Sequence, residues 1–411
     1  MKRRRESLFQ FSLRGLDTNL LIVLFFVMVF GFIMIYSASY YIAGLSKAYN
    51  NDSMYLLRSQ VIYSLLGVVA MFVVSCINYH FWSLFIVPGY LVCVVLVLLL
   101  NVPSIAVTVK GATRWLRFGS LQFQVAEPIK LIMIVFLATW IVFGQRRLRS
   151  WASMLRMILP SAIISAMILK FSDNMSTAAI LLGTAVFMIY VVHPEQWKFV
   201  LCGVGVVAAV AGVLYYVQNL DASQMEKNFR LLRIRAWLMP YEYEQDKAFQ
   251  SLQGLYAIGS GGLWGKGLGN SIQKLGKIPE PYNDYIFAII CEELGIFGAG
   301  LIILLFVYLL YRIYTISQTA EDLLGRMLAI GVFSHIALQV MLNLMVVTGL
   351  FPTTGVTLPF FSYGGTATVF LLIEIGLVLS VNKYSVKKRS EMERRGGYHV
   401  SQSYQSRQNW R

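Results

Sequence analysis

The chain has 411 residues, of which 57% are hydrophobic and 13% are charged, and its mean hydropathy is +0.63. A soluble domain would carry about twice that share of charge, so the composition excludes an ordinary soluble protein. Much of the formal net charge of +15 lies in short clusters at the ends of apolar runs, at Lys2–Arg5, Arg146–Arg149 and Lys383–Arg395. The positive-inside rule gives membrane proteins this distribution. We therefore expect a membrane protein that binds no nucleic acid.

Apolar runs long enough to cross a bilayer predict an all-α polytopic protein with about ten transmembrane helices. The runs lie at 19–36, 59–77, 82–101, 127–144, 157–171, 177–192, 198–217, 285–311, 327–349 and 366–381. The pieces at 157–171 and 177–192 are short, which suggests tilting or partial re-entry. No cleavable signal peptide is evident. With the basic start inside and an even number of spans, both termini are predicted to be cytoplasmic.

The predicted organisation has three parts: a basic N-terminus at 1–18, a membrane domain at 19–382 and a tail at 383–411. The tail is polar and rich in Ser and Gln, so we expect it to be cytoplasmic and disordered. The largest loop, at about 218–284, is predicted to lie outside the membrane. Because structureless loops of that length are uncommon in compact proteins, we expect it to carry helices of its own.

Two segments of this loop are distinctive. Residues 227–240 place Phe229, Leu232 and Ala236 on one helical face opposite basic residues, which predicts an amphipathic helix at the surface. Residues 257–280 are rich in glycine, and exposed backbone N–H groups there could cradle a phosphate. The glycine pattern matches no nucleotide-binding fingerprint.

Asp284 lies where this polar loop meets the next apolar run. A carboxylate at the mouth of a membrane helix is half-desolvated, so its neighbours can tune its reactivity. The structural alternative is an N-cap that satisfies backbone N–H groups at the start of the helix. The residues of this stretch alone favour the cap.

Further charged residues gather near the predicted outer face. Glu127 and Lys130 are three apart at the start of a span, which puts them on one helical face as either a functional pair or a structural ion pair. Arg114 could hold a phosphate or face lipid headgroups, and Trp115 suits an interfacial belt. Asp173 lies in a polar break between two spans, where a structural role is favoured.

Residues 351–368 predict a shaped outer loop that returns into the last span, which contains Glu374. The loop has two prolines, three glycines and several hydroxyl groups, Ser362 among them. The four cysteines lie in apolar runs without paired spacing, which indicates buried thiols. The placement of the four histidines argues against a Ser–His–Asp set and against a His/Cys metal cluster. Carboxylate chemistry on an anionic, lipid-borne substrate remains.

Six stretches resemble the SEDS family (shape, elongation, division and sporulation), which includes FtsW, RodA and SpoVE. They follow the family's order, and the likeness covers nearly all of residues 15–382. The last two are the most specific. The stretches are IYSAS (35–39), GATRWLRFG with AEPIK (111–130), RIRAWLMP (233–240), QSLQGLYAIGSGGLWGKGLG (250–269), PEPYNDYIFAIICEELG (279–295) and PTTGVTLPFFSYGG (352–365).

The resemblance implies a peptidoglycan glycosyltransferase that polymerises lipid II outside the bacterial cytoplasmic membrane. Asp284 matches the family's essential loop acid and would be the general base. The residues implied in substrate binding are Glu127, Lys130, Arg114, Trp115, Arg230, Arg233, Lys266 and Ser362. No cofactor is implied, although a divalent cation stays open. The implied partners are a class B penicillin-binding protein transpeptidase and other division or elongation membrane proteins.

The sequence departs from the family's pattern at three places. Residues 124–127 read QVAE instead of Gln-Pro-Ser-Glu, and 172–177 read SDNMST, which puts a catalytic role for Asp173 in doubt. Tyr282-Asn283 replaces a His-Thr pair, so no imidazole assists there. The IYSAS motif and the basic tail favour the FtsW or SpoVE type over the RodA type. A lipid II flippase and a transpeptidase-recruiting scaffold are the rival functions.

Overall fold

The computed structural model describes residues 15–109, 111–119, 121–144, 150–220, 229–245 and 248–408. Within these residues, ten helices are long and apolar enough to cross a membrane, which confirms the predicted all-α polytopic class. Nine are α1 (Thr18–Leu45), α2 (Tyr55–Cys76), α4 (Ala126–Gly144), α5 (Trp151–Phe171), α6 (Met175–Val192), α7 (Trp197–Gln218), α11 (Ile286–Thr319), α12 (Leu323–Val347) and α13 (Gly365–Gln408). The tenth is α3 (Ile86–Leu98), which 3-10 turns at Tyr79–Phe85 and Leu99–Asn101 extend at both ends.

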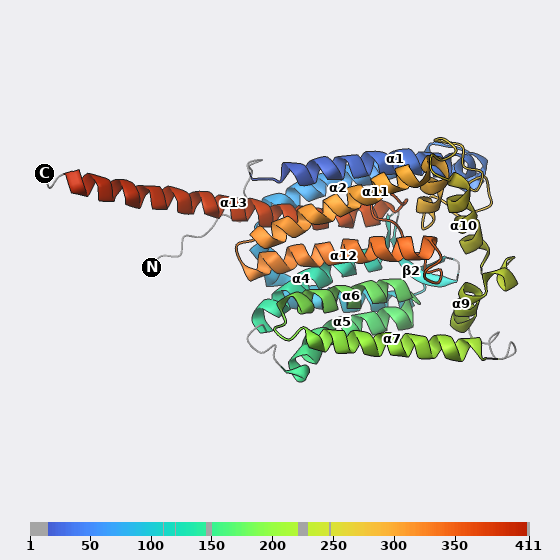
Figure 1. Ribbon diagram of the computed structural model, residues 1–411, viewed down its shortest axis with the longest axis horizontal. Coiled ribbons are helices and arrows are strands. Elements are labelled where there is room, and N and C mark those ends of the chain that lie inside the picture. The colour runs from blue at the N-terminus through green and yellow to red at the C-terminus, as the bar shows by residue number, and fades with distance from the viewer. Residues whose placement is uncertain are drawn as a thin grey trace.

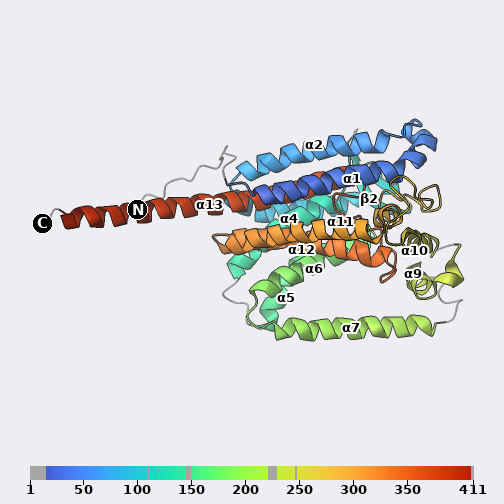
Figure 2. The same cartoon turned by 45° about the horizontal axis from the view of Figure 1, so that its top comes forward.

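The helices run side by side as one bundle (Figure 1). Helices α5 and α6 have 21 and 18 residues, and each is long enough to span a bilayer without re-entry. Helix α7 stands apart from the rest when the bundle is turned (Figure 2). The buried side chains on α7 are those of Lys198 and Val217.

The start of α1 and the later part of α13 lie at one end of the bundle. The Asn382 side chain donates to the Gly15 carbonyl oxygen at 2.9 Å, which ties the two segments together. Because ten spans return the chain to the side where it began, both described ends lie on the same side. Which side of the membrane this is stays a prediction.

The segment after Lys383 differs from the expected disorder, since α13 continues as a helix to Gln408 and projects from the bundle (Figure 1). Lys388 pairs with Glu321, and the Arg389 guanidinium donates to the Thr319 carbonyl at 2.7 Å. Lys, Arg, Glu and Met are good helix formers. The prediction of disorder used the polar composition of the tail and took account of neither these helix propensities nor these contacts.

The opposite end of the bundle, here called the loop end, carries the long loop and a small sheet. The long loop contains α9 (Phe229–Leu238) and α10 (Phe249–Gly261), which confirms that it has helices of its own. The sheet has three antiparallel strands, β1 (Ala106–Val109), β2 (Ala112–Phe118) and β3 (Leu121–Gln124). It was not predicted, because each strand is short and its alternation is masked by arginine and aromatic residues.

The glycine-rich segment of the loop packs directly on α11. The backbone N–H groups of Lys266 and Gly267 donate to the carbonyls of Glu292 and Glu293, both at 2.9 Å. These two N–H groups are already hydrogen-bonded to α11, so they are not available to cradle a phosphate. Helix α11 itself bends at Gly295, where φ is 66° and ψ is −167°.

Gly265→Ala tests this close approach. An added Cβ would lie 2.2 Å from the Glu293 carbonyl oxygen, and φ is +77°. We expect a loss of more than about 1 kcal/mol, because strain at positive φ adds to a clash with backbone that cannot move aside.

Gly269→Ala is the matched control, because Gly269 has φ +85° but no atom within 4 Å of the added Cβ. Thermal unfolding in detergent should give a clearly lower midpoint for Gly265→Ala than for Gly269→Ala. Equal midpoints would contradict the proposed role of the close approach.

Candidate functional site

Two side-chain amides on α12 hold the loop end together. Gln339 and Asn343 are four residues apart, so they lie on one face of the helix. The Asn343 Nδ2 atom donates to the Asp284 carbonyl at 2.8 Å and to the Val356 carbonyl at 2.7 Å. The Gln339 Nε2 atom donates to the Thr357 carbonyl at 3.1 Å. Helix α12 therefore fixes the segment before α11 and the 352–357 stretch against each other.

The Asp284 side chain is half-buried beside this stretch. Its Oδ1 atom accepts from Gln250 Nε2 at 3.4 Å, and its Oδ2 atom would lie 3.7 Å from a Cβ added at Gly355. The N-cap position of α11 is occupied by Tyr285, which makes no side-chain capping bond. Asp284 thus precedes the N-cap residue of this helix, and its carboxylate is next to the 352–357 stretch.

Two buried tyrosines, Tyr282 and Tyr285, lie on either side of Asp284 in the sequence. Burial raises the pKa of Tyr282, and its hydrogen bond with Tyr49 raises it further. Burial also raises the pKa of Tyr285, where the nearby Asp284 charge acts in the same direction. Both phenols therefore stay protonated at neutral pH, and Asp284 is the group between them with the chemistry of a base.

Glu127 and Lys130 form a buried ion pair in the first turn of α4, with 3.0 Å between Oε2 and Nζ. Their side chains are 8% and 5% exposed. Lys130 Nζ also donates to Gln339 Oε1 at 3.1 Å. Through Gln339 the pair is joined to Thr357, so it is part of the same assembly as Asp284. The Glu127–Lys130 pair therefore has a further partner, Gln339, and is not an isolated ion pair.

Two arginines, Arg114 of β2 and Arg233 of α9, lie near Asp173. The Arg114 Nη2 atom donates to the Asp173 carbonyl at 3.2 Å. Burial lowers the pKa of Arg114, and the charge of Arg233 lowers it further, while Asp173 opposes both. Both arginines lie near the Asp173 charge, and the three formal charges sum to a net positive charge. Such a cluster suits a diphosphate, because each guanidinium group can donate two parallel hydrogen bonds to two phosphate oxygens.

The 352–357 stretch connects the start of α6 with Asp284. Ser176 Oγ, at the start of α6, donates to the Thr354 carbonyl at 3.0 Å. Gly355, the next residue, lies beside the Asp284 carboxylate. The next two carbonyls, those of Val356 and Thr357, accept hydrogen bonds from the side-chain amides of Asn343 and Gln339. One stretch of backbone thus carries contacts to two helices, α6 and α12, and to the segment just before α11.

The remaining predicted site residues have other surroundings. Trp115 is half-buried in β2, where it is paired with Gln124 of β3. Ser362 is buried, and its Oγ accepts from the Leu358 N–H at 2.8 Å, so it shapes the turn. Arg230 falls in α9, but its side chain lies outside the described residues.

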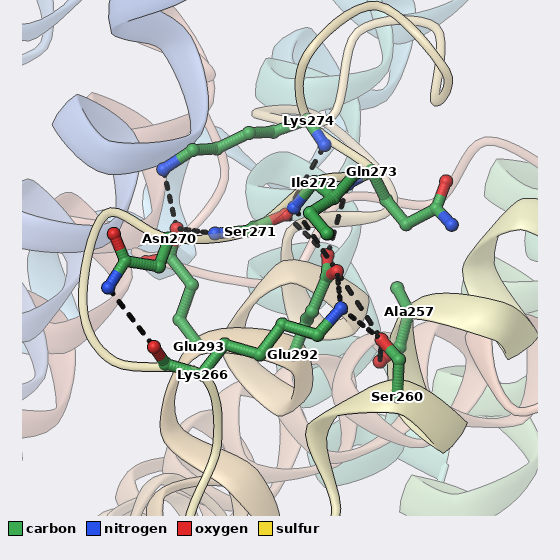
Figure 3. A network of polar contacts seen from close by, with 10 residues as sticks. All are labelled: Ala257, Ser260, Lys266, Asn270, Ser271, Ile272, Gln273, Lys274, Glu292 and Glu293. Atoms are coloured by element: carbon green, nitrogen blue, oxygen red, sulfur yellow. Dashed lines mark hydrogen bonds and ion pairs between the residues drawn. The ribbon is translucent and has the colours of Figure 1, made fainter.

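Lys266 belongs to a separate network on α11 (Figure 3). Its Nζ atom lies 2.6 Å from Glu292 Oε1. The neighbouring Glu293 pairs with Lys274 at 2.6 Å, and neither side chain is exposed. Ser271 Oγ also donates to Glu292. These two ion pairs fasten the glycine-rich segment to α11 and are not joined to Asp284 by the contacts described above.

Sequence reasoning missed Gln339, Asn343, Gln250 and Lys274. A signal existed for the first two, because polar residues four apart inside an apolar run mark one polar helical face. The sequence holds no such signal for Lys274, because Glu293 becomes its neighbour only when the loop folds back onto α11.

The fold and the site define a polytopic membrane protein with a polar assembly at one membrane boundary. The FtsW/RodA/SpoVE family model, described as a cell cycle protein, matches residues 17–387. Stage V sporulation protein E of Bacillus subtilis is 36% identical over 369 residues, which cover 90% of this chain and 97% of that protein. A probable peptidoglycan glycosyltransferase FtsW of Geobacter sp. strain M18 is 35% identical, again with 90% and 97% coverage.

Two solved structures share the fold. A chain of a peptidoglycan synthase complex has a TM-score of 0.72 at 24% identity and covers 91% of this chain and 99% of its own. The rod shape determining protein RodA of Thermus thermophilus has a TM-score of 0.63 at 24% identity, with coverage of 90% and 97%. The chain belongs to the FtsW/RodA/SpoVE family and is a multi-pass bacterial membrane protein.

Lys274→Met tests the buried network. The substitution leaves the Glu293 carboxylate buried without its cation, which should cost about 3–5 kcal/mol. Adding Glu293→Gln should recover most of that loss. Thermal unfolding in detergent measures both effects, with Lys277→Met as the control because Lys277 is an exposed lysine of the same segment. Equal stability of Lys274→Met and Lys277→Met would contradict the ion pair's role.

Asn343→Leu tests the α12 amide. It leaves two carbonyls, those of Asp284 and Val356, without their donor, at an expected cost of about 1–3 kcal/mol. Hydrogen–deuterium exchange should therefore rise at residues 279–285 and 352–357. Thr348→Val is the control, since Thr348 Oγ1 donates at 2.7 Å to the Leu344 carbonyl of its own helix. Unchanged exchange in Asn343→Leu would show that Asn343 does not hold these segments.

Proposed function

We propose that the protein is a peptidoglycan glycosyltransferase that polymerises lipid II, with Asp284 as the general base. Family membership and the names of the FtsW relatives support the activity. One observation carries the residue assignment. The Asp284 carboxylate lies beside a backbone stretch that also contacts the α12 amides and Ser176.

In this mechanism Asp284 takes the proton of the acceptor sugar's 4-hydroxyl. The hydroxyl oxygen forms the new bond to the donor's anomeric carbon. The bond from that carbon to the diphosphate oxygen breaks, and undecaprenyl diphosphate leaves with the electron pair. A single displacement inverts the configuration at the anomeric carbon.

The cationic groups would stabilise the leaving diphosphate. Arg114 and Arg233 are assigned this part, because two guanidinium groups lie close together there and can donate to phosphate oxygens. The Glu127–Lys130 pair would position the substrate from the membrane side. Lys266 is assigned to holding the glycine-rich segment, since its ammonium is paired with Glu292. Arg230 and Trp115 remain predicted substrate contacts.

The orientation follows from the chemistry of this substrate. Polymerised glycan lies outside the cytoplasmic membrane, so the loop end would face outward and both termini inward. The solved relative in a peptidoglycan synthase complex supports a transpeptidase partner, which we propose is a class B penicillin-binding protein. The SpoVE and FtsW relatives support a role in division or sporulation over one in elongation.

Asp284→Asn tests the mechanism, because the amide is nearly isosteric with the carboxylate but does not act as a base. With the transpeptidase partner present and its own active site blocked, wild type should polymerise purified lipid II into glycan strands. Asp284→Asn should lose about 10²–10⁴-fold in rate.

Asp52→Asn is the control, because Asp52 forms an ion pair with Arg58 at 3.0 Å at the start of α2. Its rate should match wild type. Near-wild-type polymerisation by a folded Asp284→Asn variant would remove Asp284 from the chemistry. No product from wild type would favour a flippase or a scaffold instead.

A further inference from the structure

A buried histidine and a buried acid lie behind the Glu127–Lys130 pair and have no part in the mechanism above. His335 of α12 and Glu374 of α13 are each 1% exposed. The His335 Nδ1 atom lies 2.8 Å from Glu374 Oε2, and its Nε2 atom lies 3.0 Å from Gln339 Oε1. The pair therefore touches the same glutamine that holds Lys130.

The hydrogen-bond partners of Gln339 decide which atom of its amide faces which way. The Thr357 carbonyl can only accept, so the Gln339 atom next to it at 3.1 Å must be the NH2 nitrogen. The amide oxygen then faces Lys130 Nζ and His335 Nε2. Because that oxygen only accepts, His335 Nε2 must carry a hydrogen.

A hydrogen on His335 Nε2 also determines what lies between His335 Nδ1 and Glu374. With Nε2 donating to Gln339, the Nδ1 atom and Glu374 Oε2 share one further proton across 2.8 Å. The pair is neutral overall whether that proton resides on the ring or on the carboxyl group. The charged groups that face this neutral pair across Gln339 are Glu127 and Lys130 of α4, which also sum to zero.

Little water reaches this place. A cavity of about 10 Å³ lies between His335 and Lys130, and the remainder of its lining is mainly apolar side chains of α4 and α6. That volume is at the lower limit for one water molecule. The Lys130 ammonium therefore depends on protein groups, and Gln339 Oε1 is the neutral one of its two acceptors described above.

We infer that His335, oriented by Glu374, is a positioning residue that locks the Gln339 amide so that its oxygen holds Lys130 and its nitrogen holds Thr357. The inference rests on the proposed function, in which Lys130 positions the substrate. When the His335 donor is lost, the Gln339 oxygen keeps one partner instead of two, and only Lys130 and Thr357 still hold the amide. The shared anchor of Lys130 and of the stretch beside Asp284 is then held less rigidly.

A double-mutant cycle tests this inference. His335→Leu removes the donor, and His335→Gln can keep an N–H near the Nε2 position. Each is compared with wild type and combined with Lys130→Met, and rates of lipid II polymerisation are measured per folded molecule. Ser334→Ala is the control, because Ser334 Oγ donates at 2.9 Å to the Gly331 carbonyl of its own helix.

We expect His335→Leu to lower kcat/KM about tenfold in the wild-type background and to change it little in the Lys130→Met background. His335→Gln should recover most of the loss, and Ser334→Ala should match wild type. A merely structural role would reduce the yield of folded protein while leaving the rate per folded molecule unchanged. Equal fold-losses in the two backgrounds, or no loss in either, would overturn the inference.

Binding of undecaprenyl diphosphate to the same variants in nanodiscs separates the two proposals. If wild type does not polymerise lipid II, the proposed function fails, while this binding cycle still tests the coupling of His335 to Lys130. Coupled losses of diphosphate affinity would support the inference. Independent losses, or a Lys130→Met variant that binds and polymerises as wild type, would overturn it.

Discussion

The site depends on hydrogen bonds from two amides that α12 carries into an apolar bundle. Asn343 gives its two hydrogens to the carbonyls of Asp284 and Val356, and Gln339 gives its own to Thr357. Backbone carbonyls buried without a donor are costly, so these bonds are expensive to leave unmade. The acid and the 352–357 stretch, far apart in the sequence, are held in register by one rigid helix.

The charged groups on α11 and those near the sheet differ in how they are paired. Fully buried pairs, such as Lys274 with Glu293, fasten the glycine-rich segment to α11 and leave no net charge. Two arginines, Arg114 and Arg233, lie near the single carboxylate of Asp173 at the loop end. The proposed diphosphate site would use the positive charge of these arginines, whereas removing one partner of a buried ion pair is strongly destabilising.

Hydropathy was enough to predict the ten spans, because bilayer thickness sets the length of an apolar helix. The sequence also predicted the place of Asp284 at the start of α11 and the Glu127–Lys130 pair, which depend on local order. It did not predict the β1–β3 sheet or the α13 extension. The contact of Lys130 with Gln339 joins residues 209 apart, and no local pattern contains it. Likewise, the glycines at 261–267 suggested a phosphate cradle by sequence, whereas in the structure they pack against α11.

The most direct measurement is an experimental structure of the protein with its transpeptidase partner and bound lipid II. The account predicts the acceptor's 4-hydroxyl oxygen within hydrogen-bond reach of the Asp284 carboxylate, roughly 2.6–3.2 Å away. It also predicts the diphosphate beside Arg114 and Arg233. A bound acceptor whose hydroxyl meets a different base, with the Asp284 carboxylate turned away from the sugar, would contradict the central claim.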